Sequence, residues 1–349
     1  MKAAVLHGIR DIKYEEVDMP QMGPNDVLIK VKVCGICGSD IPRYFSDAAH
    51  FYPIILGHEF SGVIADKGKN VPENISIGNR AAVAPLMPCH TCSACQKGLH
   101  SLCKNYKFVG SSFNGAMADF VVVPYKNIIT FPDTVSFTQG AFFEPSTIGL
   151  HGLFCADYCG GNTVAILGVG TIGLFTMQWC KLLGARQIVA FDIDDDRLEL
   201  AKKLGADEIV NTTQDDFMNK AQSYVENEGY EYVFETAGNN ITMNYAFQLA
   251  GNRSTVCFIG TSSKDLNFSW RDFELMNRKE FNLTGSWMGY SAPFPGKEWI
   301  LTSEYLSKDK LIIDENIIDT VYEMEEGKIA FERFATPGSV KGKILLVNE

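Results

Sequence analysis

The sequence predicts an α/β protein with a β-rich domain and a doubly wound domain, on the basis of its length and two residue patterns. At 349 residues the chain is long enough for about two domains of ~150 residues each. The first ~150 residues contain short alternating segments such as "DVLIKVKVC" and "FVVVP" and no long helical pattern, which is typical of β-strands. Between about residues 152 and 289, apolar strands alternate with helical segments, which indicates a parallel sheet covered by helices. We therefore expect domains at 1–151 and 152–289.

The composition argues against several classes of protein. Hydrophobic residues make up 46% and charged residues 21% of the chain, which is ordinary for a soluble globular protein. The net charge of −11 argues against nucleic acid as the main partner, because a protein that binds it needs a basic face. The longest apolar run, "TVAILGVGTIGLF", is too short and too rich in glycine for a transmembrane helix, and we expect no signal peptide at the amino terminus. Ten cysteines then indicate a cytoplasmic protein with reduced thiols, some of them metal ligands.

Four cysteines gather in the stretch "CHTCSACQKGLHSLC", at Cys89, Cys92, Cys95 and Cys103. Closely spaced thiolates can reach one tetrahedral zinc ion, and a shell of four sulfurs leaves no open position for substrate. This pattern therefore predicts a structural zinc site in a loop. Free cysteines are one alternative. A zinc ribbon that binds DNA is another, but Lys97 is the only lysine or arginine of the stretch and Lys104 follows directly after it, which gives little charge for phosphate.

A second group of metal-binding residue types is spread along the chain. "VCGICGSD" contains Cys37, "LGHEFSGVI" contains His58 and "FFEPSTIGLHG" contains Glu144. One thiolate, one imidazole and one carboxylate would leave the fourth position of a zinc ion open for water or substrate, which is the pattern of a catalytic site. Cys37 and His58 are 21 residues apart, so the fold and not the local spacing must bring them together. Taken alone, a histidine such as His58 is more often structural than a ligand.

A glycine motif lies in the second predicted domain. Gly168, Gly170 and Gly173 form the pattern G-x-G-x-x-G between a predicted strand at 163–167 and a predicted helix at about 172–183. The glycines permit a tight turn and close approach of the backbone to a pyrophosphate, and the helix N-terminus supplies N–H groups for it. In this strand–turn–helix context the motif predicts a dinucleotide-binding site.

The acidic residue after this motif predicts the cofactor. Asp192 ends the next strand, "QIVAFD", 19 residues past Gly173. Its carboxylate should accept hydrogen bonds from the adenosine ribose and repel a 2′-phosphate, which favours NAD over NADP. A turn residue at a strand end is the alternative for Asp192. Arg197 could flank the ribose or could be an exposed charge on a helix.

Two later strands end in glycine turns, in "VCFIGTSS" and "NLTGSWMGY". Ligands of doubly wound sheets bind at the carboxyl ends of the strands. Candidates for lining the nicotinamide side are therefore Thr261, Gly285 and Ser286.

Together these motifs resemble the medium-chain zinc-dependent alcohol dehydrogenases. The run "GHEFSG" that contains His58, with Gly68 after it, is similar to the zinc signature of that family, and the four-cysteine loop falls where the family carries its structural zinc. The resemblance covers essentially the whole chain. Glu144 stands where members with two Cys and one His carry the second cysteine. That departure resembles the polyol-dehydrogenase branch, which is related to sorbitol dehydrogenase.

The resemblance implies the ligands of the catalytic zinc, which would be Cys37, His58 and Glu144. Glu59 is close enough in the sequence to bind this zinc directly or through water. Asp40 would orient the ligand histidine and fix its tautomer. Ser39 would pass the proton of the alcohol outward. For Ser39 and Asp40, a simple turn is the alternative.

The resemblance also implies the architecture and the reaction. The β-rich catalytic domain would have a GroES-like fold completed by residues 290–349, whose strand "GKILLVN" would return to it, and 152–289 would be a Rossmann domain. Substrate, metal and nicotinamide would meet in the cleft between the domains. The implied reaction is reversible hydride transfer to NAD, with zinc polarising the substrate oxygen. We expect two zinc ions per chain and a homodimer or homotetramer.

Three stretches, "CGSDIPRYF", "HFYPIILGHEFSG" and "GSWMGYSAPFPGKEW", resemble the members of this branch that act on galactitol 1-phosphate. They imply a hexitol phosphate that is oxidised to a ketose phosphate. Arg43 is the best candidate for the phosphate anchor, because a guanidinium group can bind two phosphate oxygens. A surface or interdomain salt bridge is its alternative role. His50 and Lys297 are weaker candidates, and an unphosphorylated polyol or diol such as sorbitol, xylitol or butanediol is the alternative substrate.

A non-catalytic zinc protein that kept the fold is an alternative from a different class. Loss of Cys37, of His58 or of the glycine motif would support it, and all are present. Two zinc ions per chain and NADH production from an alcohol would indicate the enzyme. One zinc ion and no turnover of any polyol would indicate the binding protein.

Overall fold

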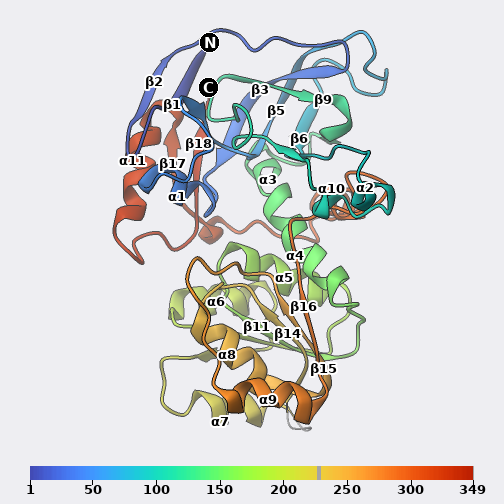
Figure 1. The fold of residues 1–349 in the computed structure, drawn as a ribbon, viewed down its shortest axis with the longest axis vertical. Coiled ribbons are helices and arrows are strands. Elements are labelled where there is room, and N and C mark those ends of the chain that lie inside the picture. The colour runs from blue at the N-terminus through green and yellow to red at the C-terminus, as the bar shows by residue number, and fades with distance from the viewer. Residues whose placement is uncertain (226–228, 349) are drawn as a thin grey trace. The chain divides into compact units, whose positions relative to one another are not determined.

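The computed structural model describes residues 1–225 and 229–348, and the chain forms two compact units (Figure 1). Unit 1 comprises Met1–Glu144 and Tyr290–Glu349, and unit 2 comprises Pro145–Gly289. Unit 1 is built mainly from β-strands, whereas unit 2 holds a parallel sheet with helices between its strands. The predicted fold class is thereby confirmed.

Unit 1 contains three sheets. Their strands are β1 (Lys2–Leu6), β2 (Ile12–Glu16), β3 (Asp26–Gly35), β4 (Ile54–Ile55), β5 (Glu59–Lys67), β6 (Arg80–Val83), β7 (Leu86–Met87), β8 (Lys107–Phe108), β9 (Phe120–Pro124), β10 (Ile128–Phe131), β17 (Ile318–Glu323) and β18 (Lys343–Val347). The largest sheet has the order β10-β6-β5-β3-β18-β17, with β9 also paired to β3, and the smaller sheets are β2-β1-β4 and β7-β8.

The helices of unit 1 are short. They are α1 (Asp40–Phe45), α2 (Ser93–Gln96), η1 (His100–Leu102), η2 (Tyr125–Asn127), α3 (Phe137–Ala141), α10 (Lys297–Ser307), η3 (Glu315–Ile317), η4 (Met324–Glu326), α11 (Gly327–Glu332) and η5 (Arg333–Ala335). The chain passes from unit 1 to unit 2 within α4 (Phe143–Cys155).

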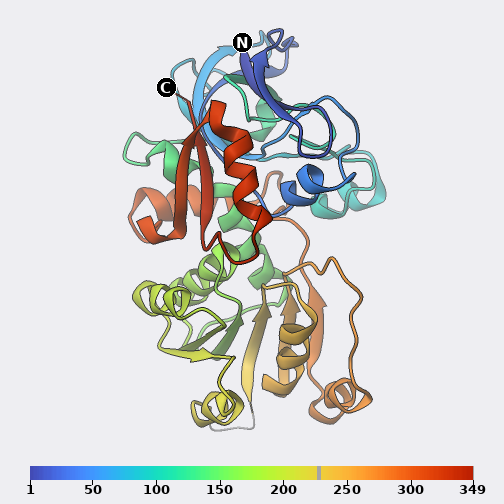
Figure 2. The same ribbon diagram turned by 90° about the vertical axis from the view of Figure 1, so that its left-hand side faces the viewer.

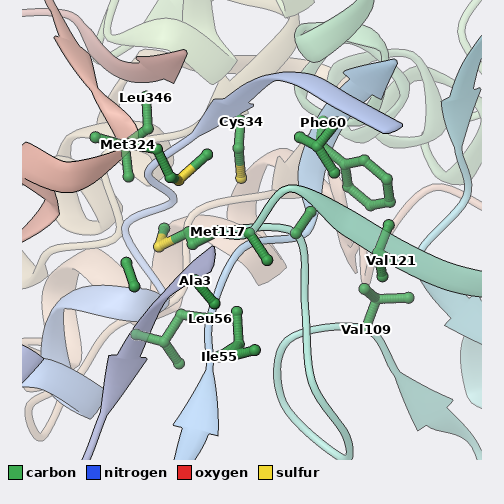
Figure 3. Close-up of a cluster of buried hydrophobic side chains, with 14 of the residues drawn as sticks. Ala3, Cys34, Ile55, Leu56, Phe60, Val109, Met117, Val121, Met324 and Leu346 are labelled. Carbon is green, nitrogen blue, oxygen red and sulfur yellow. The ribbon is translucent and has the colours of Figure 1, made fainter. Parts of the chain in front are cut away.

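The core of unit 1 joins residues that are far apart in the sequence (Figure 3). Cys34 of β3 pairs with Phe60 of β5, and both side chains are buried in this cluster. Leu346 of the carboxy-terminal strand packs into the same cluster, because β18 pairs antiparallel with β3. The alternation of apolar and polar residues along β3 places its apolar side chains in this core. The end of β3 is thus held by β5 on one side and by β18 on the other, and Cys37 lies two residues after it.

Unit 2 has a six-stranded parallel sheet with the order β13-β12-β11-β14-β15-β16, which Figure 2 shows from one edge strand to the other. The strands are β11 (Thr163–Leu167), β12 (Gln187–Asp192), β13 (Glu208–Asn211), β14 (Tyr230–Glu235), β15 (Ala250–Phe258) and β16 (Asn282–Gly285). The helices are α5 (Thr171–Leu182), α6 (Asp195–Leu204), α7 (Phe217–Ser223), α8 (Asn240–Leu249) and α9 (Trp270–Lys279). The strand order changes direction between β11 and β14, so right-handed crossovers place α5 and α6 on one face and α8 and α9 on the other.

The glycine motif forms the turn between β11 and α5. Gly168 has a φ of +86°, a conformation that favours glycine. A methyl group on Gly173 would collide with the carbonyl oxygen of Gly168, so the first turn of α5 packs directly on the turn before it. Both glycines are therefore required by the local geometry.

The domain boundary that we expected at 151/152 falls inside α4, whereas the two units divide at residues 144/145. Pro145 suggests a break in a helical pattern, but it occupies the first turn of α4, where the missing N–H costs nothing. The residues 290–349, expected to complete the first domain, lie in unit 1.

Candidate metal and cofactor sites

The pairing of β3 with β5 brings the first group of metal-binding side chains together. Gly35 pairs with Glu59, so Cys37, two residues beyond β3, lies near His58, which immediately precedes β5. One donor atom from each of Cys37, His58 and Glu59 lies within 4.8 Å of the other two. His58 and Glu59 are buried. The fold therefore brings Cys37 and His58 together, although they are 21 residues apart in the sequence.

Asp40 supports this group from the first turn of α1. Its Oδ2 accepts a hydrogen bond of 3.3 Å from the backbone N–H of Cys37, and its Oδ1 lies 3.7 Å from Nδ1 of His58. That nitrogen is buried and has no hydrogen-bond partner within the described part of the chain. The ring of Phe108 packs edge-to-face on the His58 ring, with 5.2 Å between the centroids. Asp40 is thus placed beside both Cys37 and His58.

Arg43 is held inside the same site. Its Nη1 donates to Oδ1 of Asp40 and to the carbonyl oxygen of Ser39, both at 3.0 Å, and its Nη2 donates to Oγ of Ser111 at 3.2 Å. The side chain is only 16% exposed. Arg43 does form a salt bridge, but this bridge is neither at the surface nor between domains, because it lies within α1 and reaches the buried carboxylate of Asp40. The hydroxyl of Ser39 lies 3.3 Å from the sulfur of Cys37, and Ser39 is exposed.

A buried lysine from the carboxy-terminal strand completes the surroundings of Glu59. Nζ of Lys343 lies 2.8 Å from Oε1 and 2.6 Å from Oε2 of Glu59, and it also donates to the carbonyl oxygen of Ile36. Burial opposes the charge of Lys343, but attraction to Glu59 and Cys37 outweighs it and raises the pKa of the lysine. Lys343 therefore forms a buried ion pair with Glu59 beside the thiol of Cys37.

Glu144, the third ligand that we expected, lies in the first turn of α4 and is buried. Burial and, to a smaller extent, repulsion from Glu59 raise the pKa of Glu144 to about 7. Attraction to His58 opposes this rise. Glu59 supplies the carboxylate of the group in which one donor atom each of Cys37, His58 and Glu59 lie within 4.8 Å of one another. Glu144 belongs to the same electrostatic environment, because Glu59 and His58 both act on its pKa.

The charges of the site fit a divalent cation. The ionisable groups that gather here are the thiol of Cys37, the carboxyl groups of Asp40, Glu59 and Glu144, and the basic groups of Arg43 and Lys343. With all of them ionised, negative charge exceeds positive charge by two, which a divalent ion would neutralise. Burial and the nearby Glu59 also raise the pKa of the Cys37 thiol, so a cation is needed to hold it as a thiolate. Thiolate, imidazole and carboxylate are the donors that zinc prefers.

The four-cysteine loop forms a second group. One sulfur from each of Cys89, Cys92, Cys95 and Cys103 lies within 4.8 Å of the others. Those of Cys92 and Cys103 are 3.9 Å apart, close to the separation of about 3.8 Å that four zinc–sulfur bonds of 2.3 Å impose. The thiol of Cys89 accepts hydrogen bonds from the hydroxyl of Thr91 and the N–H of Cys92, which lower its pKa to about 5. Hydrogen bonds also lower the pKa of Cys92, whereas burial raises the pKa of Cys95 to about 12, so a cation is needed to hold all the sulfurs as thiolates. The spacing of the sulfurs fits zinc.

Unit 2 contains a cavity of about 300 Å³ at the carboxyl ends of β11, β12 and β14. It is lined by Leu167, Gly168, Gly170, Phe191, Asp192, Ile193, Arg197, Thr212, Thr236, Ala237, Asn239 and Thr242. The carboxylate of Asp192 accepts hydrogen bonds from the N–H groups of Val169 and Ile193, both at 2.8 Å. The cavity thus joins the glycine turn, Asp192 and Arg197, as expected for the adenosine side of a dinucleotide site.

The remaining predicted residues lie outside these groups. Thr261 is exposed just after Gly260, beyond β15, and Gly285 is exposed at the end of β16. The hydroxyl of Ser286 is buried and has no hydrogen-bond partner within residues 1–225 and 229–348. His50 is exposed in the loop before β4, and Lys297 is exposed at the start of α10.

Sequence reasoning missed Lys343, Ser111 and the threonines of the cavity. Lys343 has one visible signal, since it is a lysine at the start of the apolar strand "KILLV". Ser111 and Thr242 are polar residues of turns or first helical turns, and nothing in the sequence distinguishes them from other such residues. Within the described residues, no helix has the length and apolar character that crossing a membrane requires.

Two family models match the chain. The model for the alcohol dehydrogenase GroES-like domain matches residues 23–133, and the model for the zinc-binding dehydrogenase matches residues 171–302. Galactitol 1-phosphate 5-dehydrogenase of Escherichia coli (strain K12) is 36% identical, with 99% of this chain and 100% of the relative covered. Sorbitol dehydrogenase of Bacillus subtilis (strain 168) is 31% identical, with 95% and 93% covered.

Solved structures of similar dehydrogenases superpose on this chain along nearly its whole length. The crystal structure of galactitol-1-phosphate dehydrogenase from Escherichia coli superposes with a TM-score of 0.94 at 36% identity, covering 100% of both chains. A structure described as a zinc-binding dehydrogenase from Sinorhizobium meliloti 1021, bound to NADP, superposes with a TM-score of 0.89 at 29% identity, covering 99% of each chain.

Proposed function

Because this chain belongs to the zinc-dependent alcohol dehydrogenases, and within them to the polyol dehydrogenases, we propose that it oxidises a hexitol phosphate with NAD. We propose galactitol 1-phosphate as the substrate and tagatose 6-phosphate as the product. The observation that carries the proposal is the convergence of Cys37, His58 and Glu59 beside Asp40, together with the similarity to the galactitol-phosphate enzyme. An unphosphorylated polyol is the second candidate, because sorbitol dehydrogenase is also similar.

In this proposal Cys37 and His58 hold the catalytic zinc, with Glu144 as third ligand and Glu59 close enough to serve directly or through water. Zinc, when bound, supplies Lewis-acid polarisation of the substrate oxygen. Asp40 orients the imidazole of His58 from 3.7 Å. A second zinc at Cys89, Cys92, Cys95 and Cys103 is structural.

The chain's own residues then move the proton and hold the cofactor. Ser39 lies beside Cys37 and is exposed, so its hydroxyl can pass the substrate proton outward. Bound NAD would supply the hydride acceptor. Asp192 and Arg197 bind the adenosine ribose, and Thr261, Gly285 and Ser286 line the nicotinamide side in this proposal.

We propose that the protein works in the cytoplasm as a homo-oligomer. None of the ten cysteines, all of them within the described residues, forms a disulfide, which suits a reducing compartment. β16 is an edge strand of unit 2, and the exposed Trp270 of α9 and Leu283 of β16 are apolar side chains that a second copy would cover. Size-exclusion chromatography with light scattering distinguishes a dimer, a tetramer and a monomer, and a monomer would contradict the proposal.

The preference for NAD can be tested at Asp192. We expect Asp192→Ala to raise the ratio of NADP to NAD efficiency (kcat/KM) by at least about tenfold, because both a ribose acceptor and a charge that repels the 2′-phosphate are lost. Activity with NAD should also fall, since Asp192 accepts from Val169 of the glycine turn. Asp195→Ala, which removes an exposed carboxylate of α6 that accepts from Asn211, is the charge-matched control. An unchanged ratio would mean that Asp192 does not face the ribose.

The substrate can be tested by initial rates of NADH production at equal concentrations of galactitol 1-phosphate, sorbitol 6-phosphate, galactitol, sorbitol and butanediol. We expect Arg43→Ala to raise KM for the phosphorylated substrates by about 10- to 100-fold, as the loss of a charge-assisted hydrogen bond implies. Because Arg43 also binds Asp40 and Ser39, we expect kcat to fall for every substrate.

His50→Ala and Lys297→Ala test the weaker anchors in the same assay. If Arg43→Ala raised KM equally for phosphorylated and free polyols, Arg43 would act only through its salt bridge with Asp40 and would not bind the phosphate. Faster turnover of free sorbitol than of any polyol phosphate by the wild-type enzyme would reject the phosphate substrate and leave a general polyol dehydrogenase.

A further inference from the structure

Unit 2 contains a buried carboxyl group that the proposed reaction does not use. Glu235 ends β14 and is fully buried. Its Oε1 accepts three hydrogen bonds, from the N–H of Ala237 at 2.9 Å, the N–H of Gly238 at 2.8 Å and the hydroxyl of Thr242 at 2.7 Å. One oxygen atom therefore ties the start of the turn after β14 to the first turn of α8.

The second oxygen of Glu235 lies beside a different turn. Oε2 is buried and has no hydrogen-bond partner within the described residues. A methyl group on Gly260 would lie 2.8 Å from this oxygen, and it would also collide with the N–H of Gly238. The backbone carbonyl of Glu235 accepts from the N–H groups of Ile259 and Gly260. Glu235 thus lies where the turns after β14 and β15 pack on each other.

The turn that Glu235 holds forms one wall of the cofactor cavity. Thr236, Ala237, Asn239 and Thr242 line the cavity together with residues of the glycine turn and Asp192. Burial raises the pKa of Glu235, and the hydrogen bonds from Thr242 and Gly238 oppose this rise. Burial of a carboxyl group is destabilising unless hydrogen bonds offset its desolvation. The hydrogen bonds of Glu235 also order a loop that lines the cofactor cavity.

We propose that Glu235 is a positioning residue that holds residues 236–242 in the conformation that binds the adenosine half of the dinucleotide. If this wall is ordered before the cofactor binds, the binding free energy does not include the entropy cost of ordering it. The proposal rests on the proposed function, since it requires a nicotinamide dinucleotide in this cavity. It assigns no contact between Glu235 and the cofactor, so the effect of Glu235 passes through Ala237, Gly238 and Thr242.

Calorimetric titration of the purified protein with AMP and with NAD tests this proposal without turnover. We expect Glu235→Ala to weaken the binding of both ligands by at least about tenfold, because both contain the adenosine half. Glu235→Gln retains an oxygen acceptor for the three donors, so its Kd values should stay within about threefold of wild type. In steady-state assays Glu235→Ala should raise KM for NAD more than it lowers kcat.

Glu231 provides a matched control on the same strand. Its carboxylate also accepts a backbone N–H, that of Thr163, but at the opposite end of β14 and outside the cavity. Glu231→Ala should lower the Tm and leave the Kd for AMP unchanged.

If Glu235→Ala does not fold, Thr242→Val provides the test, because it removes one of the three donors to Glu235. Thr242→Val should weaken AMP binding, whereas Thr242→Ser, which keeps the hydroxyl, should bind AMP like the wild type.

Three outcomes would overturn the proposal. The first is wild-type affinity for AMP in folded Glu235→Ala or, where that variant does not fold, in Thr242→Val. The second is a loss for NAD without one for AMP, which would assign Glu235 to the nicotinamide side through Gly260. The third is a wild-type protein that binds neither NAD nor NADP, which would reject the proposed cofactor as well. A wild-type protein that binds NAD but oxidises no polyol phosphate would reject only the proposed substrate.

Discussion

Replacement of Cys37 by serine is expected to lower kcat by about a thousandfold or more while the fold persists. Cys37 supplies the thiolate of the group that it forms with His58 and Glu59. Lewis-acid catalysis by a metal contributes several kcal/mol, and each 1.36 kcal/mol is a factor of ten in rate. Cys37 lies in the loop after β3 and is absent from the core cluster of unit 1, so the Tm should change little. Elemental analysis should show a fall from two zinc ions per chain to one.

A cysteine outside both metal groups provides the control for this variant. Cys159 is exposed in unit 2 and contacts Tyr232 and Asn162. Cys159→Ser should keep both zinc ions and most of the activity. If Cys37→Ser also kept both zinc ions and most of its activity, Cys37 would not be a ligand of the catalytic zinc.

The metal donors could be predicted from the sequence to the extent that they lie in local patterns. The four cysteines at 89–103 are close in the chain, so their spacing alone predicted the group that the fold forms. His58 and Glu59 are adjacent, and adjacent side chains of a strand point to opposite faces. Because β5 begins at Glu59 and His58 lies before it, both side chains reach the same site. Alternation along a strand therefore did not predict that Glu59 joins His58 in this group.

Long-range contacts explain most of what the sequence did not reveal. Lys343 reaches Glu59 across 284 residues, through the pairing of β18 with β3. A lysine at the start of an apolar strand draws attention to Lys343, but lysines normally extend into solvent, so the three-dimensional pairing is needed to identify its buried partner Glu59. The contact of Arg43 with Asp40 is different, because a spacing of three residues on one helix could have predicted it. Its significance depends on the burial of Asp40, which the sequence does not show.

Replacement of Cys95 by serine should act on stability rather than on chemistry. The loop at 89–103 contains only the four-residue α2 and the three-residue η1, and its cysteines lie outside the core cluster of unit 1. A metal ion bound by four thiolates would therefore be the main element that orders it, and binding energy at such a site is folding energy. We expect the Tm to fall by at least about 5 °C, since about 2 kcal/mol shifts the Tm by that amount in a domain of about 200 residues.

Limited digestion with trypsin locates the effect, because Lys97 and Lys104 are exposed in this loop. Cys95→Ser should be cut after these lysines under conditions in which the wild-type protein is not, and it should lose one zinc ion per chain. Ser93→Ala, a change in the same loop that removes no thiol, should resist digestion and keep its zinc. Where the Cys95→Ser protein remains folded, kcat should fall far less than in Cys37→Ser, because the Cys37 donor group is intact. A Cys95→Ser protein of wild-type stability without activity would reverse the assignment, making the four-cysteine loop the catalytic site and the Cys37 group the structural one.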